Sequence, residues 1–164
     1  DAKYLRASYQ HQNYIALNKR FTLAFNTEFG WGKGMSGSPF PVFKTFYAGG
    51  LGSVRGFEQG TLGPKDTSGA HLGGAKKLLG AVELQTPFPG AGNDRTLRMF
   101  AFADIGNVFG ENQKYNLSDL RASAGVGISW ISPVGPLRLA LANPIRKQTG
   151  DKIQRLQFQI GTSF

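Results

Sequence analysis

A single cation lies in a glycine-rich run at residues 49–57, which read GGLGSVRGF. Four of these residues are glycines and the other neighbours of Arg55 are small or apolar. The backbone can therefore turn sharply and pack closely around the guanidinium. A planar group with five N–H donors is well suited to binding carboxylates inside a cavity. The run predicts a loop that carries Arg55 into the interior of the protein, toward acidic side chains.

An acidic partner for Arg55 lies in a strand-like segment further along the chain. Residues 102–106 read FADIG, and strand alternation puts Phe102 and Asp104 on one face and Ile105 on the other. We therefore expect an ion pair between a loop and the wall of a sheet.

Seven segments of about ten residues alternate between apolar and polar side chains and are separated by Gly, Pro, Asn and Asp. This pattern predicts antiparallel strands joined as a meander. One face of these segments is rich in small and polar residues, which suits a water-filled lumen rather than a packed core. We expect strands at about residues 3–15, 21–31, 76–86, 95–108, 120–131, 137–142 and 152–164, with a long loop at 34–74.

The last segment alternates most regularly and ends on an aromatic residue. Its polar face carries Gln157 and Gln159. Its apolar face predicts an exposed strand edge that suits strand addition, and comprises Leu156, Phe158, Ile160, Thr162 and Phe164.

Together, these features resemble the BamA family of outer-membrane β-barrel assembly proteins. The resemblance extends over residues 1–164 and corresponds to the carboxy-terminal part of the family's barrel domain, without its periplasmic POTRA domains or its first strands. Three motifs carry it: Val54-Arg55-Gly56-Phe57 in a long loop, Phe102-x-Asp104-x-Gly106 on a later strand, and the terminal Phe164.

The resemblance implies an all-β fold, namely the C-terminal portion of a transmembrane antiparallel β-barrel in the bacterial outer membrane, with the long loop inserted into the lumen. It implies that Arg55 contacts Asp104 on the inner wall, with Glu83 as a second acid. The expected loop–lumen anchor comprises Val54, Arg55, Gly56, Phe57, Glu83, Phe102, Asp104 and Gly106. The expected β-signal and seam comprise Leu156, Phe158, Ile160, Thr162 and Phe164.

The implied function is the insertion and folding of other barrel proteins, without a chemical step, a nucleotide or a cofactor. The implied partners are outer-membrane lipid and lipopolysaccharide, unfolded outer-membrane proteins, and accessory lipoproteins of an assembly complex. Two alternatives stay open. One is a two-partner secretion transporter of the same superfamily, and the other is a small outer-membrane channel or hydrolase.

Few residues offer catalysis or metal binding. There is no cysteine, and the two histidines lack metal-ligand spacing. Glu83 and Asp104 could form a catalytic carboxylate pair, and Asp104 could act with Ser123 or His71 in a hydrolase. A buried arginine without partners would be strongly destabilising, so we favour the interpretation that both acids neutralise Arg55. We expect no enzyme activity and no metal site.

Composition excludes two further classes. No apolar run approaches the length of a transmembrane helix, so the chain is not a helical membrane protein. The net charge of +9 arises from 19 basic and 10 acidic residues. These cations are scattered, without a basic stripe interleaved with aromatics, so we expect no nucleic-acid partner. Lumen lining and lipid phosphates account for them.

Strand count and orientation follow from the same pattern. If Phe164 lies at the periplasmic side, the short turns at 18–20, 88–94 and 132–136 are periplasmic and the longer connections at 34–74, 109–119 and 143–151 are extracellular. Seven strands leave two unpaired edges, which lipid does not tolerate. A further strand within 34–74, a larger barrel, or two copies of the chain would each resolve this.

Overall fold

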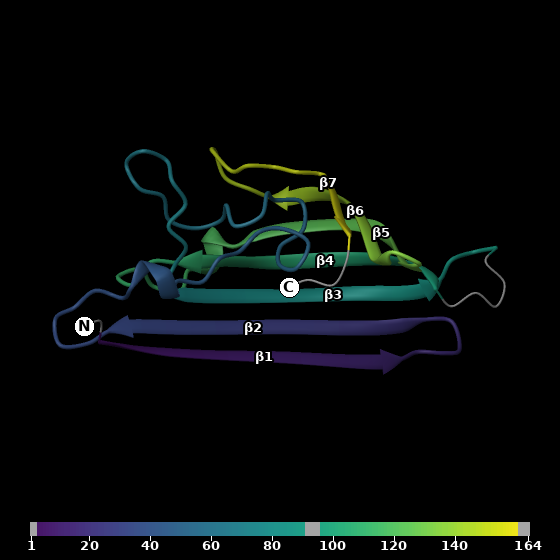
Figure 1. The fold of residues 1–164 in the computed structure, drawn as a ribbon, viewed down its shortest axis with the longest axis horizontal. Coiled ribbons are helices and arrows are strands. Elements are labelled where there is room, and N and C mark those ends of the chain that lie inside the picture. Colours follow the sequence, from purple (N-terminus) through teal and green to yellow (C-terminus); the bar gives the residue numbers. More distant parts are fainter. Residues whose placement is uncertain (1–2, 91–95, 161–164) are drawn as a thin grey trace.

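The strands follow one another in the sheet in chain order (Figure 1). The computed structural model describes residues 3–90 and 96–160. Each strand pairs antiparallel with its neighbours in sequence, so β1 and β7 form the two edges of a meander. The predicted all-β fold is confirmed. The strands are β1 (Tyr4–Ala16), β2 (Thr22–Gly34), β3 (Lys76–Pro87), β4 (Leu97–Phe109), β5 (Arg121–Ser132), β6 (Gly135–Arg146) and β7 (Leu156–Ile160).

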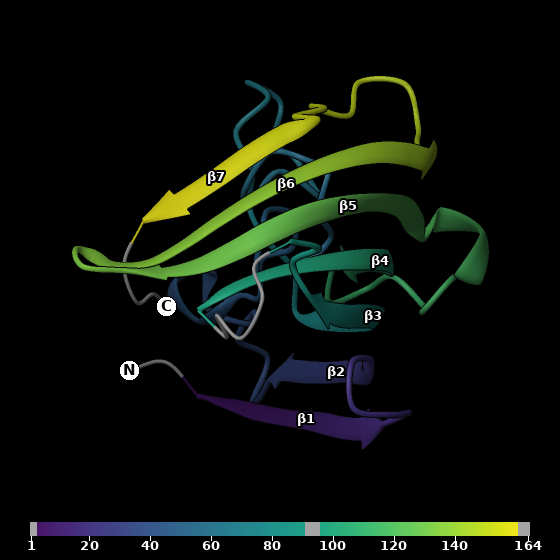
Figure 2. The same ribbon diagram turned by 90° about the vertical axis from the view of Figure 1, so that its right-hand side faces the viewer.

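The two faces of the sheet differ as the sequence predicts. On β6, Leu139 and Leu141 are 36% and 56% exposed, whereas Ala140 and Ala142 are each 1% exposed. The sheet is curved (Figure 2), and exposed apolar residues alternate along its strands with buried ones. The inner face carries small and polar side chains, together with two phenylalanines, Phe100 and Phe102, that are buried.

The segment between β2 and β3 lies on the concave face of the sheet (Figure 2). It contains one short 3₁₀ helix, η1 (Val42–Lys44), and isolated bridges such as Phe46 with Gly74 and Ala48 with Leu62. Residues 35–75 are all described and include no strand, so a strand missed in this loop does not explain the odd strand count. The loop contributes most of a buried cluster formed by Phe46, Ala48, Val54, Phe57, Leu62, Leu79 and Val108.

Short and long connections lie at opposite ends of the sheet, as the meander requires. The connection between β4 and β5 contains a second 3₁₀ helix, η2 (Leu117–Asp119). Glu111 in this connection accepts hydrogen bonds from the backbone N–H groups of Gly34 and Phe40, at 3.2 and 2.7 Å, and so ties it to the long loop. None of the helices in the described residues is long and apolar enough to cross a membrane.

The last strand differs from its prediction. Regular pairing with β6 begins at Leu156, rather than near Lys152, and residues 161–164 lie outside the described residues. Residues 152–154 pair with the long loop instead, through a bridge between Phe57 and Ile153. Sequence alternation alone does not reveal this, because a segment that pairs with a loop alternates like one that pairs with a strand.

Candidate functional site

Arg55 is held by the carboxylates of two different strands. Its Nε and Nη2 atoms donate to the two carboxylate oxygens of Asp104, on β4, each at 2.7 Å. Its Nη1 atom donates to Glu83, on β3, at 2.5 Å. The backbone N–H of Arg55 also donates to Asp104, at 3.0 Å. Arg55, Asp104 and Glu83 are 6%, 2% and 8% exposed. This is the bidentate geometry in which arginine binds carboxylates most strongly.

Aromatic rings form the floor of this cluster. The Arg55 guanidinium carbon lies 3.8 Å from the centre of the Phe102 ring, a distance at which a cation is attracted to an aromatic face. On β5, a Cβ added to Gly125 would lie 2.8 Å from the Phe102 ring, and one added to Gly127 would lie 2.4 Å from the Phe100 ring. The small face predicted for β5 therefore makes room for these two rings.

A second arginine completes the charge balance. Arg138, on β6, donates to the same Glu83 oxygen at 3.0 Å and stacks over the Phe100 ring at 4.5 Å. Burial would lower the pKa of Arg55, but the hydrogen bonds and charges of Asp104 and Glu83 outweigh it and raise the pKa. The two carboxylates therefore favour the charged form of Arg55.

The remaining loop residues of the predicted anchor pack closely on the sheet. Gly56 has a φ of +95°, and a Cβ at this position would lie 3.1 Å from the Cβ of Ala142, so a glycine is required both by its backbone and by its surroundings. A Cβ on Gly106 would lie 3.1 Å from Val54. Val54 and Phe57 are both fully buried, at 0% exposed. The structure thus brings together all eight residues of the predicted anchor, and their functional role stays a prediction.

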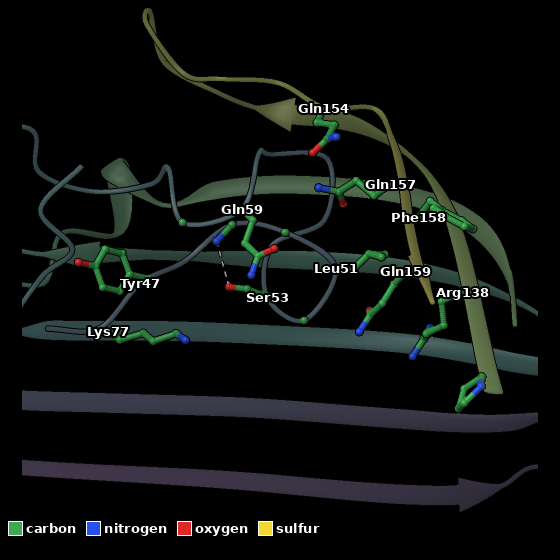
Figure 3. Close-up of a pocket in the computed structure, with 15 residues that line it drawn as sticks. Tyr47, Leu51, Ser53, Gln59, Lys77, Arg138, Gln154, Gln157, Phe158 and Gln159 are labelled. Carbon is green, nitrogen blue, oxygen red and sulfur yellow. Dashed lines mark hydrogen bonds between the residues drawn. The ribbon is translucent and has the colours of Figure 1, made fainter. Parts of the chain in front are cut away.

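Gln157 is a contact residue that the sequence interpretation did not single out. Its Nε2 donates to the Phe57 carbonyl at 2.8 Å, and its Oε1 accepts from the Gly56 N–H at 3.1 Å. Its place on the polar face of the last strand was the sequence signal that could have identified this contact. Gln157 lines a cavity of about 1050 Å³ between the loop and the sheet, together with Lys77 and Arg138 (Figure 3).

The predicted seam is described in part. Leu156, Phe158 and Ile160 are 58%, 61% and 57% exposed. Thr162 and Phe164 lie outside the described residues.

Ser123, Glu83 and Asp104, which were considered for catalysis, are not arranged as a reactive site. Ser123 pairs with Asp104 across β4 and β5, but it is 1% exposed and lies beneath Gly56, so a substrate has no access to it. Both carboxylates are already bound by Arg55. Among residues 3–90 and 96–160, no group of three His, Asp or Glu side chains is placed to hold a metal ion.

Comparison with known proteins identifies relatives along the whole chain. Residues 1–164 match the model of the Omp85 superfamily domain. The outer membrane protein assembly factor BamA of Neisseria meningitidis is 38% identical over 99% of this chain and 24% of its own length. The human sorting and assembly machinery component 50 homolog is 32% identical over 100% of this chain and 38% of its own length.

A solved structure agrees with these relatives. The crystal structure of BamA from Haemophilus ducreyi lacking POTRA domains 1–3 superimposes with a TM-score of 0.86 at 29% identity. The match covers 95% of this chain and 34% of that chain. The chain therefore spans about a quarter to two fifths of the length of these three proteins.

Proposed function

The chain belongs to the Omp85 superfamily, and from this premise we propose that it forms part of a β-barrel in the bacterial outer membrane that inserts and folds other barrel proteins. Its curated relatives include several named outer membrane protein assembly factor BamA. Because the chain spans only part of their length, the activity, substrates and partners of the whole protein belong to this proposal.

The observation that carries the proposal is an anchored loop beside a last strand that, in the described residues, pairs with β6 alone. Residues 156–160 of β7 pair with β6, and the described part of the chain places no other strand beside them. The outer edge of β7 can accept an extended chain by strand addition.

No chemical step is needed for this activity. An unfolded outer-membrane protein would pair its strands with the exposed edge, and folding of its own sheet would then supply the driving force. The seam residues Leu156, Phe158 and Ile160, together with Thr162 and Phe164, would form this edge. Lipid, lipopolysaccharide and accessory lipoproteins are the further partners that the proposal includes.

Reconstitution tests this function. The intact protein is placed in phospholipid liposomes, an unfolded outer-membrane barrel protein is added, and its protease-resistant folded fraction is followed over time. We expect faster folding than in empty liposomes, and slower folding with Arg55→Ala. A matched control is Lys65→Ala, which removes an exposed loop cation that donates only to the Gly150 carbonyl and should leave the rate unchanged.

The alternatives give different results in the same system. Conductance without accelerated folding would support a passive channel. Turnover of an ester or peptide that is lost with Asp104→Asn would support a hydrolase. Passage of one soluble partner through the lumen would support a secretion transporter. Any of these without accelerated folding would overturn the proposal.

A further inference from the structure

The loop forms backbone hydrogen bonds with the segment that precedes β7. Glu58 N–H donates to the Lys152 carbonyl, and Gln154 N–H donates to the Gly56 carbonyl, each at 2.9 Å. Phe57 and Ile153 are the bridged pair between these two bonds. Residues 56–58 therefore act as a short antiparallel strand, although they belong to a loop about one hundred residues away in the sequence.

The loop pairs with the edge of residues 152–154 that faces away from β6. The Ala142 N–H donates to the Arg155 carbonyl at 2.8 Å, so odd-numbered residues of this segment present their backbone groups to β6. Successive residues of a strand present them to opposite edges. The Lys152 carbonyl and the Gln154 N–H thus belong to the opposite edge, which in β7 is the outer edge of the sheet.

Pro144 explains why this segment leaves the sheet. Extension of the β6–β7 register by the same spacing would place Ile153 opposite Pro144. Pro144 lies two residues beyond Ala142, at the next position whose N–H would point toward the last strand, and proline has no N–H to donate. The ladder therefore ends at Ala142 and Arg155, while on the other edge Ile153 lies opposite Phe57.

The Gln157 side chain binds the loop to the last strand. Its side chain is 5% exposed and satisfies the Gly56 N–H and the Phe57 carbonyl, which flank the peptide bond between these residues. Ile153 packs against the buried cluster that contains Phe57. Side chains as well as backbone therefore couple the loop to the strand.

We propose that residues 56–58 form an edge cap, which covers the free edge of the last strand at residues 152–154 and is positioned by Gln157. An extended polypeptide strand, the partner that fits such an edge, can pair with β7 itself but reaches residues 152–154 only when the edge cap withdraws. Uncovered strand edges are sites of unwanted pairing, and the edge cap limits pairing to one end of the strand. The consequence for assembly rests on the function proposed above, whereas the cap itself does not.

Hydrogen exchange of the intact protein in detergent tests the edge cap without any substrate. Gln157→Met keeps the side-chain volume and removes two hydrogen bonds, so exchange in peptides that contain Glu58 and Gln154 should accelerate together, on the order of tenfold or more. Exchange in β3–β4 should stay unchanged. Gln10→Met, the same substitution at an exposed position of β1, should leave both peptides as in the native protein. Acceleration at Glu58 alone, or equal effects of the two variants, would overturn the proposal.

A reversible crosslink tests the consequence. Phe57 and Ile153 form a non-hydrogen-bonded pair, whose short Cα separation suits a disulfide, and the native chain has no cysteine. Phe57→Cys with Ile153→Cys should crosslink on oxidation, slow the folding of an added barrel protein in liposomes by about tenfold, and recover with reductant. With each single-cysteine variant, the folding rate of the added protein should not change on oxidation.

The outcomes separate the two proposals. Failure to crosslink in a folded double variant, or equal rates before and after reduction, would overturn the edge cap while leaving the assembly function intact. If neither the native protein nor the variants accelerate folding, the assembly function fails, and the exchange experiment still decides whether the cap exists.

Discussion

Arg55 is buried but paired, because carboxylates from two strands bind its guanidinium. Asp104 occupies two of its donor groups and Glu83 a third, while Arg138 balances the second acid. Such a buried set contributes little net free energy relative to apolar packing, but loss of one member leaves an uncompensated charge. The cluster therefore determines where the loop lies more than how stable the sheet is.

Arg55→Ala should destabilise the loop anchor by about 3 kcal/mol, the lower end of the range for breaking a buried charge set, since water from the adjoining cavity can reach the two acids. Arg55→Lys should restore only part of this, because a point charge cannot bridge two carboxylates. Limited proteolysis of the loop from outside, in intact membranes, measures the effect.

The charge swap Arg55→Glu with Asp104→Arg provides the control for this anchor. The double variant should protect the loop better than the worse single variant. If it does not, and a cysteine at Ser53 reacts equally with an external thiol reagent whether or not Arg55 is present, the loop is not anchored by this pair.

Tyr115 predicts that the stability of the connection between β4 and β5 depends on pH. Its hydroxyl donates to the Gly30 carbonyl at 2.6 Å, and burial raises its pKa above the ordinary value of about 10. The neutral phenol is therefore favoured in the folded state. Its stabilising contribution is complete below about pH 10 and is lost as the pH rises through the higher folded pKa.

We expect the connection between β4 and β5 to become protease-sensitive as the pH rises above about 10. Tyr115→Phe keeps the stacking on Phe29 but removes the hydroxyl, so it should weaken this connection by about 1 kcal/mol and abolish the pH-dependent step. Cleavage rates of both proteins across this range test the assignment, and an identical pH profile for Tyr115→Phe would refute it.

At the scale of the elements, alternation predicted which face of each strand meets lipid. Phe158 and Val126 are 61% and 57% exposed on the outer face, in a sheet whose opposite face is filled by the loop. Arginine at either position should cost about 2–4 kcal/mol near the middle of the bilayer. Arginine at Gln159, on the inner face, should cost much less.

Folded yield in lipid after heating, measured for Phe158→Arg, Val126→Arg and Gln159→Arg, tests this division. The three positions receive the same side chain, so the comparison isolates the face. Equal losses at all three would count against a membrane-spanning sheet.

The sequence determines the strands and the anchor better than it determines the contacts of the loop. Alternation places Asp104 inward because a strand has a period of two, and the glycines around Arg55 indicate a closely packed cation. No local pattern indicates that residues 56–58 pair with residues 152–154, since this contact depends on where a long loop turns. Pro144 was a visible signal that the last ladder is interrupted, but its consequence becomes clear only once the register is known.

At the scale of the whole molecule, the two edges of the sheet constrain how it can exist in lipid. Within residues 3–90 and 96–160, β1 and β7 each pair with one strand only, and nearly all of β1 is exposed. Unpaired backbone groups cost several kcal/mol each in hydrocarbon, so a sheet with two free edges is not stable as a separate body in a bilayer. Either further strands or a second copy must complete it.

We expect a polypeptide of residues 1–164 alone to form dimers or larger species in detergent rather than a folded monomer, because strand addition at β1 and β7 satisfies both edges. Light scattering of the purified species gives its mass. The intact protein, whose relatives extend well beyond the matched region, should behave as a monomer under the same conditions. A monodisperse 17.7 kDa monomer with a protected β1 would mean that the two edges pair with one another. In that case β7 has no free edge for an incoming strand to join, and the strand-addition mechanism would be wrong.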